Sequence, residues 1–257
     1  MSNGKDNNIH FSFFCIIKKT MENLPVHISI LFILTTFVCI AIFYKATQNP
    51  KTFLFIMSGW LILQGIVSLT GFYTNTKGLP PRFVLLIVPP LAIIACLFLT
   101  FKGRRFIDNL NEKTLTLLHL VRIPVELGLY WLFVYKTIPG LMTFEGRNFD
   151  ILSGITAPII FYFGFIKKKL SNEIIITWNI ICLALLLNIV INAILAAPFS
   201  FQQFAFEQPN IAIAYFPFIW LPCCIVPIVL FSHLAVIRNL WRSKTTLKFT
   251  QAATLVT

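Results

Sequence analysis

The sequence predicts an all-α protein, a polytopic transmembrane helical bundle of seven spans, and three observations carry that prediction. Hydrophobic residues fill 57% of the 257 positions and charged residues only 12%, whereas about 25% of the residues of a soluble domain are charged. The hydrophobic residues form long blocks separated by short charged connections. A block of about 20 apolar residues, rising roughly 1.5 Å each, matches a bilayer core of about 30 Å. The sequence lacks the short alternating segments of a transmembrane β-barrel.

Seven hydrophobic blocks predict the spans. In chain order they are 26–44, 53–72, 83–101, 115–135, 151–166, 174–196 and 211–237. The fifth is the shortest, since 151–166 would form only about 24 Å of helix between Asp150 and Lys167. We therefore expect Asp150 to begin this span below the membrane surface.

Lysine and arginine predict the orientation, because cytoplasmic connections near span ends are enriched in these residues. One alternating set of connections carries 13 of them and the other carries seven. The richer set holds Lys45, Lys51, Lys102, Arg104, Arg105, Lys113, Lys167, Lys168, Lys169, Arg238, Arg242, Lys244 and Lys248. This predicts a protein of the cell (inner) membrane with its N-terminus outside and its C-terminus inside. The net charge of +12 then reflects topology, so the expected partner is the lipid bilayer and not nucleic acid.

The spans divide the chain into an N-terminal tail at 1–25, a seven-helix domain at 26–237 and a basic cytoplasmic tail at 238–257. The first 20 residues lack the apolar core and small-residue cleavage site of a signal peptide. Met21 opens "MENLPVHISILF", which reads as a natural beginning of the first span. A start codon at Met21 is therefore an alternative to a functional tail.

Cysteine and histidine usage indicates neither a metal site nor a cofactor. Five of the six cysteines fall inside expected spans, where a disulfide framework would not place them. The four histidines are far apart and show no ligand spacing. The adjacent Cys223 and Cys224 are expected to be small packing residues.

The stretch "HLVRIPVEL" (119–127) places three polar side chains in an apolar block. On a helix His119, Arg122 and Glu126 share one face, because they are three and four residues apart. Glu126 would lie about 17 Å from the cytoplasmic start of the fourth span, near the middle of the bilayer. A charge facing lipid there would cost several kcal/mol, so this face must look into protein or water. We expect Arg122 and Glu126 to pair.

The next loop, "MTFEGRNFDIL" (142–152), is also charged. Because the fifth span is short, we expect this loop to dip inward and approach Glu126. One hypothesis is an outward-facing polar vestibule, lined by Arg122, Glu126, Glu145, Arg147 and Asp150. The alternative is structural: Asp150 or Asn148 caps a helix, and the Arg122–Glu126 pair joins two helices.

Polar residues on other spans add candidates. Asn188 and Asn192 are four residues apart and share a face of the sixth span. We expect them to make interhelical hydrogen bonds, with contact to a solute as the alternative. His233, in the second half of the seventh span, is expected to lie at the membrane interface.

The run "RIPVELGLYWLFVYKTIPGLMTFEGRNFDILSGITAP" (122–158) resembles the central signature of uncharacterised seven-span membrane proteins found mainly in Bacteroidota. Elsewhere only the hydrophobic patterning is similar. No activity is established for that group, so the resemblance implies a multi-pass inner-membrane protein and assigns no catalytic residue.

Known seven-span classes limit the function. A retinal protein needs a Schiff-base lysine in its last span, and 211–237 contains none. No cofactor motif or soluble domain is evident, which weighs against an enzyme.

Two functions remain. The first is transport, by a carrier or permeation protein in which Glu126, balanced by Arg122, binds a proton or a small polar solute. The second is a membrane-embedded lipid-modifying enzyme, or a non-catalytic sensor or assembly subunit, whose polar face meets a lipid headgroup or a partner helix.

Overall fold

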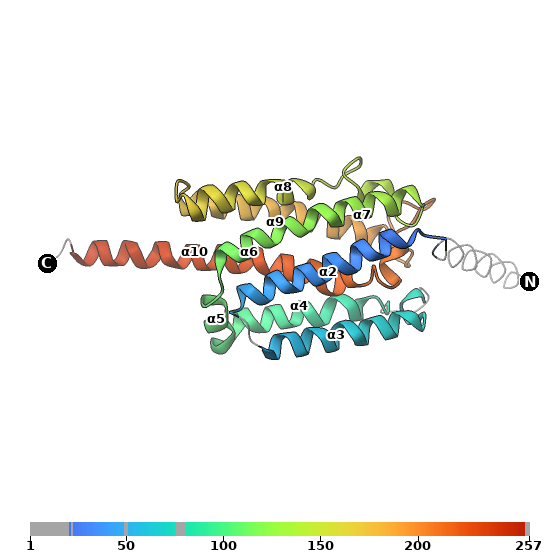
Figure 1. Ribbon diagram of the computed structural model, residues 1–257, viewed down its shortest axis with the longest axis horizontal. Coiled ribbons are helices and arrows are strands. Elements are labelled where there is room, and N and C mark those ends of the chain that lie inside the picture. The colour runs from blue at the N-terminus through green and yellow to red at the C-terminus, as the bar shows by residue number, and fades with distance from the viewer. Residues whose placement is uncertain (1–20, 22, 49–50, 76–80, 255–257) are drawn as a thin grey trace, which may run out of the picture.

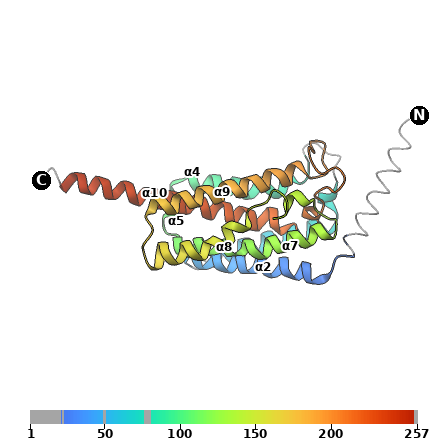
Figure 2. The ribbon, with the colours of Figure 1, turned by 90° about the horizontal axis from the view of Figure 1, so that it is seen from above.

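The computed structural model describes residues 21, 23–48, 51–75 and 81–254. Residues 1–20 of the expected tail lie outside these ranges. Within them the regular elements are helices and no strand occurs, which confirms the all-α prediction. The long helices lie side by side along the long axis (Figure 1), and the view from above shows the same bundle (Figure 2). Short 3₁₀ turns lie at Phe72–Thr74, Gly140–Met142 and Ala212–Ala214.

Five helices in the described ranges are long and apolar enough to cross a membrane. They correspond to the expected first, second, fourth, sixth and seventh spans. The five are Val26–Ala46 (α2), Lys51–Leu69 (α3), Glu112–Val134 (α6 and α7), Asn172–Leu195 (α9) and Leu221–Ser243 (the first part of α10 and the turn before it). A total of seven crossings would require both the bent third span and the shorter fifth span to cross the membrane.

The expected third span bends sharply at its C-terminal end. Helix α4 (Val84–Leu99) and helix α5 (Phe101–Asp108) meet at 89°. Thr100 caps α5, because its side chain accepts a hydrogen bond from the Gly103 amide at 3.1 Å. Gly103 permits the close approach of the two helices: a Cβ there would lie 2.3 Å from the carbonyl oxygen of Leu97. The span therefore ends two residues before the expected 101.

The fourth span is a helix with a local break. Helices α6 (Glu112–Leu118) and α7 (Arg122–Val134) are joined by the 3₁₀ turn His119–Val121. Pro124 follows one turn later and cannot donate a hydrogen bond back to that turn, which explains the change in helix type there.

The fifth block has the expected bounds. Helix α8 (Ile151–Ile160) contains Pro158 and continues as a π-helical segment, Phe161–Ile166. Pro158 lacks the amide hydrogen that a helix would bond back to residue 154, and the π-helical winding begins three residues after it.

The last span begins later than the sequence predicts. It consists of the π-helical segment Leu221–Ile225 and helix α10 (Val226–Thr254), whereas 211–220 is mostly irregular. Pro217 lacks an amide hydrogen and its ring obstructs a regular helix, which the hydrophobic pattern alone does not reveal. Helix α10 also continues past 237 without a break, so the described part of the expected basic tail, 238–254, is an extension of this helix.

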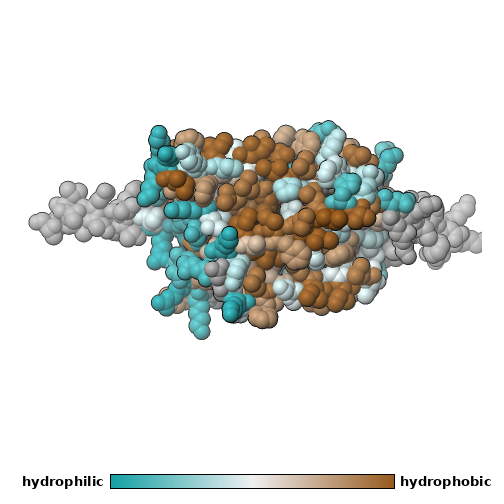
Figure 3. Space-filling view, in the orientation of Figure 1, coloured by the Kyte–Doolittle hydropathy of each residue, from teal (hydrophilic) through white to brown (hydrophobic). Residues whose placement is uncertain are grey.

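The connections rich in Lys and Arg gather at one end of the bundle. There the Asn111 amide donates to the Ala46 carbonyl at 3.0 Å, and the Asn172 side chain donates to the Ser243 hydroxyl at 3.4 Å. The first bond joins the end of α2 to the start of α6, and the second joins the start of α9 to α10. Hydrophilic side chains cover this end, where α5 lies (Figure 3).

The opposite end is closed by the two long connections 136–150 and 196–220. The amides of Ile211 and Ala212 donate to the Thr137 carbonyl at 3.1 and 3.2 Å. The loop before α8 is thereby anchored beside the loop before α10.

Large apolar side chains cover the outside of the bundle between these ends. Phe55, Leu69 and Leu99 are 79%, 74% and 76% exposed, and a hydrophobic band runs across the middle of the molecule in Figure 3. Such a surface is a liability in water but suits lipid chains. This surface and the five long apolar helices of the described chain fit a helical membrane protein.

Candidate functional site

A group of polar side chains lies buried where α7, α9 and α10 meet the loop before α8. Taken as whole residues, its members are each at most 5% exposed. We call this group the buried polar network. Its members are His119, Arg122, Glu126, Asn148, Asp150, Asn179 and His233.

Arg122, the first residue of α7, is the centre of the network. Its Nη1 forms an ion pair with Oδ1 of Asp150, immediately before α8. Its Nη2 donates to Nε2 of His233 on α10 at 2.9 Å. One guanidinium thus ties together three separate parts of the chain.

The hydrogen bonds fix the tautomer of His233. Because a guanidinium nitrogen can only donate, Nε2 of His233 must accept and carries no hydrogen. Nδ1 then carries it and donates to Oδ1 of Asn179 at 2.8 Å. The Asn179 amide is held in the matching orientation, since its Nδ2 donates to the Ile175 carbonyl at 2.9 Å. His233 is therefore a neutral ring fixed between Arg122 and Asn179.

His119 lies against His233 with the two rings stacked. Their centroids are 3.8 Å apart and their planes differ by 12°, and Trp178 meets the His119 ring edge-on at 5.6 Å. The His119 side chain is fully buried, yet neither of its ring nitrogens has a hydrogen-bond partner in the described part of the chain. Buried polar atoms of this kind cost free energy unless they are hydrogen bonded. The two ring nitrogens of His119 are therefore a cost in the folded chain that no described hydrogen bond offsets.

Glu126 lies one turn further along α7 and is not part of the ion pair. Its two carboxylate oxygens accept hydrogen bonds from Nδ2 of Asn148 at 2.8 and 2.7 Å. Asn148 is fixed in turn, because its Nδ2 also donates to the Met142 carbonyl and its Oδ1 accepts from the Asp150 amide, both at 3.0 Å. No Lys, Arg or His in the described part of the chain forms an ion pair with Glu126. The network thus holds one carboxylate with a cation partner and one without.

The loop before α8 is folded so that it enters the bundle. After the 3₁₀ turn Gly140–Met142, the amide of Asn148 donates to the Thr143 carbonyl at 3.3 Å, which turns the chain inward. Helix α8 then starts close to α7: a Cβ on Gly154 would lie 2.8 Å from Cγ1 of Ile123. A larger residue at 154 would push the start of α8 away from the network.

The network lies near the middle of its candidate spans. Arg122 is about 15 Å of helix from Glu112, where its span begins. His233 is about 18 Å from Leu221 and about 15 Å from Ser243, the two ends of its own span. Arg122 therefore lies as far along its span as the sequence predicts, whereas His233, expected at the interface, lies near the middle of its span.

The structure corrects the expected pairing of Arg122 with Glu126. The two residues are one turn apart, but Arg122 pairs with Asp150 and Glu126 is bonded by Asn148. The expectation that the loop approaches Glu126 is confirmed, through Asn148. Asp150 does occupy the position that caps α8, yet its side chain contacts Arg122 and caps no amide of the helix.

The five residues expected to line a vestibule do not share one environment. Arg122, Glu126 and Asp150 are buried, whereas Glu145 and Arg147 are exposed on the loop. The buried three are closed to water in this conformation, so a vestibule lined by all five is not formed.

Asn188 and Asn192 are not hydrogen bonded to the network. Nδ2 of Asn188 donates to the Arg147 carbonyl at 2.8 Å and so ties α9 to the loop before α8. Nδ2 of Asn192 donates to the Asn188 carbonyl, within its own helix, at 3.0 Å. A bond to another element, as the spacing predicts, is therefore found for the first residue and not for the second.

Sequence reasoning missed three members of the network. His233 is expected at the interface but is fully buried. Asn148 and Asn179 bond to partners 22 and 54 residues away, which no local pattern identifies. The one available signal was a strongly polar residue inside an apolar block, as at Asn179 in "IITWNIICL".

The cysteines of the described chain are free, and Cys223 and Cys224 are buried, as expected of packing residues. No group of three or more His, Cys, Asp and Glu within the described ranges is arranged to hold a metal ion.

Comparison with known proteins gives one match. A family model described as "Domain of unknown function (DUF8737)" matches residues 80–241, a range that contains the whole buried polar network. No curated protein and no solved structure matches the chain. The likeness to the Bacteroidota group stays a prediction, because the family description names neither organisms nor spans.

Proposed function

Since the chain belongs to the family of this domain of unknown function, whose description names no activity, we propose a function from the buried polar network itself. We propose that the protein is a carrier or permeation protein of the cell (inner) membrane that handles a proton or a small polar solute. The observation that carries this proposal is Glu126, a carboxylate that is 2% exposed and forms no ion pair within the described part of the chain.

The proposal includes a membrane arrangement. It counts seven crossings, with the bent α4 and the short α8 as spans. The end that collects the Lys and Arg residues faces the cytoplasm and the N-terminus lies outside. Helix α5, at 89° to α4, then lies along the membrane surface.

Charge balance explains why Glu126 suits reversible binding. Arg122 and Asp150 neutralise each other, so an ionised Glu126 adds an unbalanced negative charge near mid-span. Burying such a charge costs several kcal/mol, and the uptake of a proton or a cationic group removes that cost. Glu126 is therefore the group that binds and releases the transported species.

The loop before α8 connects Glu126 to the ion pair. Asn148 holds Glu126 and accepts a hydrogen bond from the Asp150 amide, while the Asp150 side chain holds Arg122. A change of charge at Glu126 therefore acts on the ion pair through two residues of one loop. Movement of this loop would open the network toward one side of the membrane, as alternating access requires.

Three polar atoms of the network have no hydrogen-bond partner among the described residues: Nε of Arg122 and both ring nitrogens of His119. The arginine supplies a donor, and a neutral imidazole supplies one donor and one acceptor. A small solute with both donor and acceptor groups matches this set.

One observation favours the second function, a non-catalytic sensor or assembly subunit. The hydrogen bonds of Arg122, His233 and Asn179 join α7, α9 and α10, and buried polar contacts can fix how helices assemble. The lipid-modifying enzyme has no comparable observation in its favour.

Reconstitution into liposomes tests the transport proposal. Proton flux and the flux of a panel of polar solutes would be measured under imposed pH gradients for the wild type and for Glu126→Gln. We expect wild-type flux above that of empty liposomes and loss of most of it in the variant, because glutamine cannot take up a proton.

The matched control is Glu207→Gln, which removes an exposed carboxylate from the loop before α10. This variant should transport like the wild type. Amounts of folded protein must be equal in all samples. Wild-type flux at the level of empty liposomes, or equal flux in wild type and Glu126→Gln, contradicts the proposal and favours the assembly function.

A further inference from the structure

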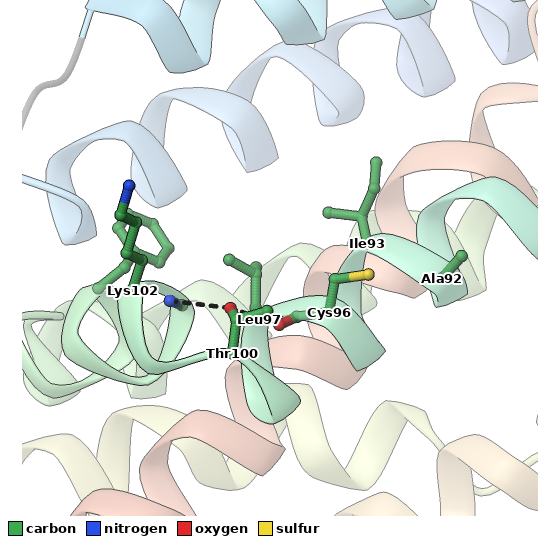
Figure 4. A pocket seen from close by; sticks show the side chains of 8 residues that line it. Ala92, Ile93, Cys96, Leu97, Thr100 and Lys102 are labelled. Atoms are coloured by element: carbon green, nitrogen blue, oxygen red, sulfur yellow. Dashed lines mark hydrogen bonds between the residues drawn. The ribbon is translucent and has the colours of Figure 1, made fainter.

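The bend between α4 and α5 encloses a hollow on the outside of the bundle (Figure 4). Its volume of about 450 Å³ lies within the range of about 300–1,000 Å³ that small-molecule sites occupy. Its lining is mostly apolar and is contributed by α4 on one side and by α5 on the other, with Thr100 between them. The residues that matter below are Ile93, Cys96, Leu97, Thr100, Lys102 and Phe106.

Positive charge borders this hollow on the α5 side. Figure 4 shows Lys102 from α5 and Ile93 from α4 extending to the same side of the bend. Arg104 and Arg105 follow on α5 and are exposed. The acidic residue of α5, Asp108, lies at the far end of the helix. The hollow thus combines an apolar wall with a basic rim.

Helix α5 has the form of an interfacial helix. It buries Gly103 and Ile107 against the bundle and exposes its basic residues and Phe101, which is 74% exposed. Helices with a basic face and exposed apolar side chains lie at the boundary between headgroups and acyl chains. The hollow is therefore placed where α4 leaves the apolar layer and α5 meets the headgroups.

We propose that this hollow binds an anionic phospholipid of the cytoplasmic leaflet. An acyl chain packs on the α4 wall beside Ile93 and Leu97, and the phosphate lies next to Lys102. Charge complementarity selects this occupant, because an anionic headgroup balances the basic rim and a zwitterionic headgroup does not. The inference does not depend on the transport proposal. It requires only that the basic end of the bundle faces the cytoplasm.

Cys96 provides a reporter for the occupant. It lies in the lining and is exposed, whereas Cys39, Cys182, Cys223 and Cys224 are buried. In the full chain, Cys15, which lies outside the described residues, would be replaced by serine. A thiol reagent then modifies Cys96 first, and intact mass reports the rate.

The experiment titrates detergent-solubilised protein with phosphatidylglycerol or phosphatidylcholine and measures the lipid concentration that halves the rate of Cys96 modification. We expect phosphatidylglycerol to act at about fivefold lower concentration, the preference that one lysine gives near an anionic surface. Lys102→Gln should remove most of this preference. Lys113→Gln, which removes an exposed lysine from α6 at the same end, should keep it.

Three outcomes would overturn the proposal. The first is that the two lipids act at equal concentrations. The second is that Lys102→Gln keeps the full preference for phosphatidylglycerol. The third is that Cys96 is protected without lipid in a species of twice the mass. The last result would assign the hollow to a second copy of the chain. None of these outcomes bears on liposome flux, so the two proposals fail separately.

Discussion

Two regions of the molecule contain the same chemical pair, arginine with aspartate, in opposite surroundings. In the buried polar network the side chains of Arg122 and Asp150 are 3% and 7% exposed. At the basic end Asp108 pairs with Arg238 and Arg242, and these three side chains are 26%, 24% and 61% exposed. We call the second set the rim ion pairs.

The comparison shows that surroundings, and not the identity of the pair, set its energetic role. A buried pair is costly to form, but the loss of one partner strands the other charge away from water. A rim pair gains little, because water and salt screen it and either partner can be rehydrated. The network should therefore respond strongly to single changes and the rim weakly.

The largest expected effect comes from Arg122→Gln. It strands Asp150 and removes the donor to His233, so it should lower the free energy of unfolding by about 3–5 kcal/mol. Arg238→Gln should lower it by about 1 kcal/mol or less, since Asp108 keeps Arg242. Unfolding in mixed micelles, followed by circular dichroism, measures both. Equal losses in the two variants would remove the distinction between the regions.

A smaller effect is expected from Asn179→Leu. It leaves the Nδ1–H group of His233 buried without an acceptor, which should cost about 1–3 kcal/mol. The counterpart beside the rim ion pairs is Asn239→Leu. This change removes a donor to the Ile107 carbonyl and should cost about 0.5–1.5 kcal/mol. The same unfolding assay ranks them, and a larger loss for Asn239→Leu would contradict the assignment of roles.

The stability that the rim ion pairs contribute should depend on pH with a sign that follows from the pKa of Asp108. Partial burial raises the pKa of the Asp108 carboxyl, but hydrogen bonds and positive charge from Arg238 and Arg242 outweigh it and hold the pKa below its ordinary value. The stability that Asp108 contributes is therefore present above its unfolded pKa and is lost as pH falls through the lower folded pKa. The difference in melting temperature between wild type and Asp108→Asn should shrink in acid. A difference that grows in acid would show that the sign is wrong.

The smallest expected effect is that of Asn192→Ala. Asn192 bonds within its own helix, and alanine favours a helix more than asparagine does, so the free energy of unfolding should change by about 0.5 kcal/mol or less. Liposome flux should be unchanged as well. A marked loss of flux in stable protein would return Asn192 to the solute site.

Much of the fold was predictable, because the lengths of apolar blocks are set by the bilayer. Departures occur where proline or a cap changes the backbone: the bend at Thr100 and the late start of the last helix after Pro217. Hydropathy carries no information about either feature. The number of crossings also depends on how the bent and short helices lie in the bilayer, which sequence length does not decide.

The location of the site was predictable from the sequence, but the hydrogen-bond and ion-pair partners of its residues were not. Arg122 and Glu126 signal a protein-facing surface because charges at that depth cannot face lipid. Their partners are another matter. Spacing along one helix favours an Arg122–Glu126 pair. In the folded chain the loop before α8 brings Asp150 to Arg122 and Asn148 to Glu126, and these contacts form instead. Contacts made by tertiary folding leave no periodic trace in the sequence.

Infrared spectroscopy of Glu126 tests the central claim most directly. The claim is that this buried carboxylate, which lacks a cation partner, holds a proton when the site is closed. The C=O stretching band of a protonated carboxylic acid should be present at neutral pH in the wild type and in Glu207→Gln, and absent in Glu126→Gln. A spectrum with no such band in the wild type, or a band that Glu126→Gln leaves unchanged, would contradict the account.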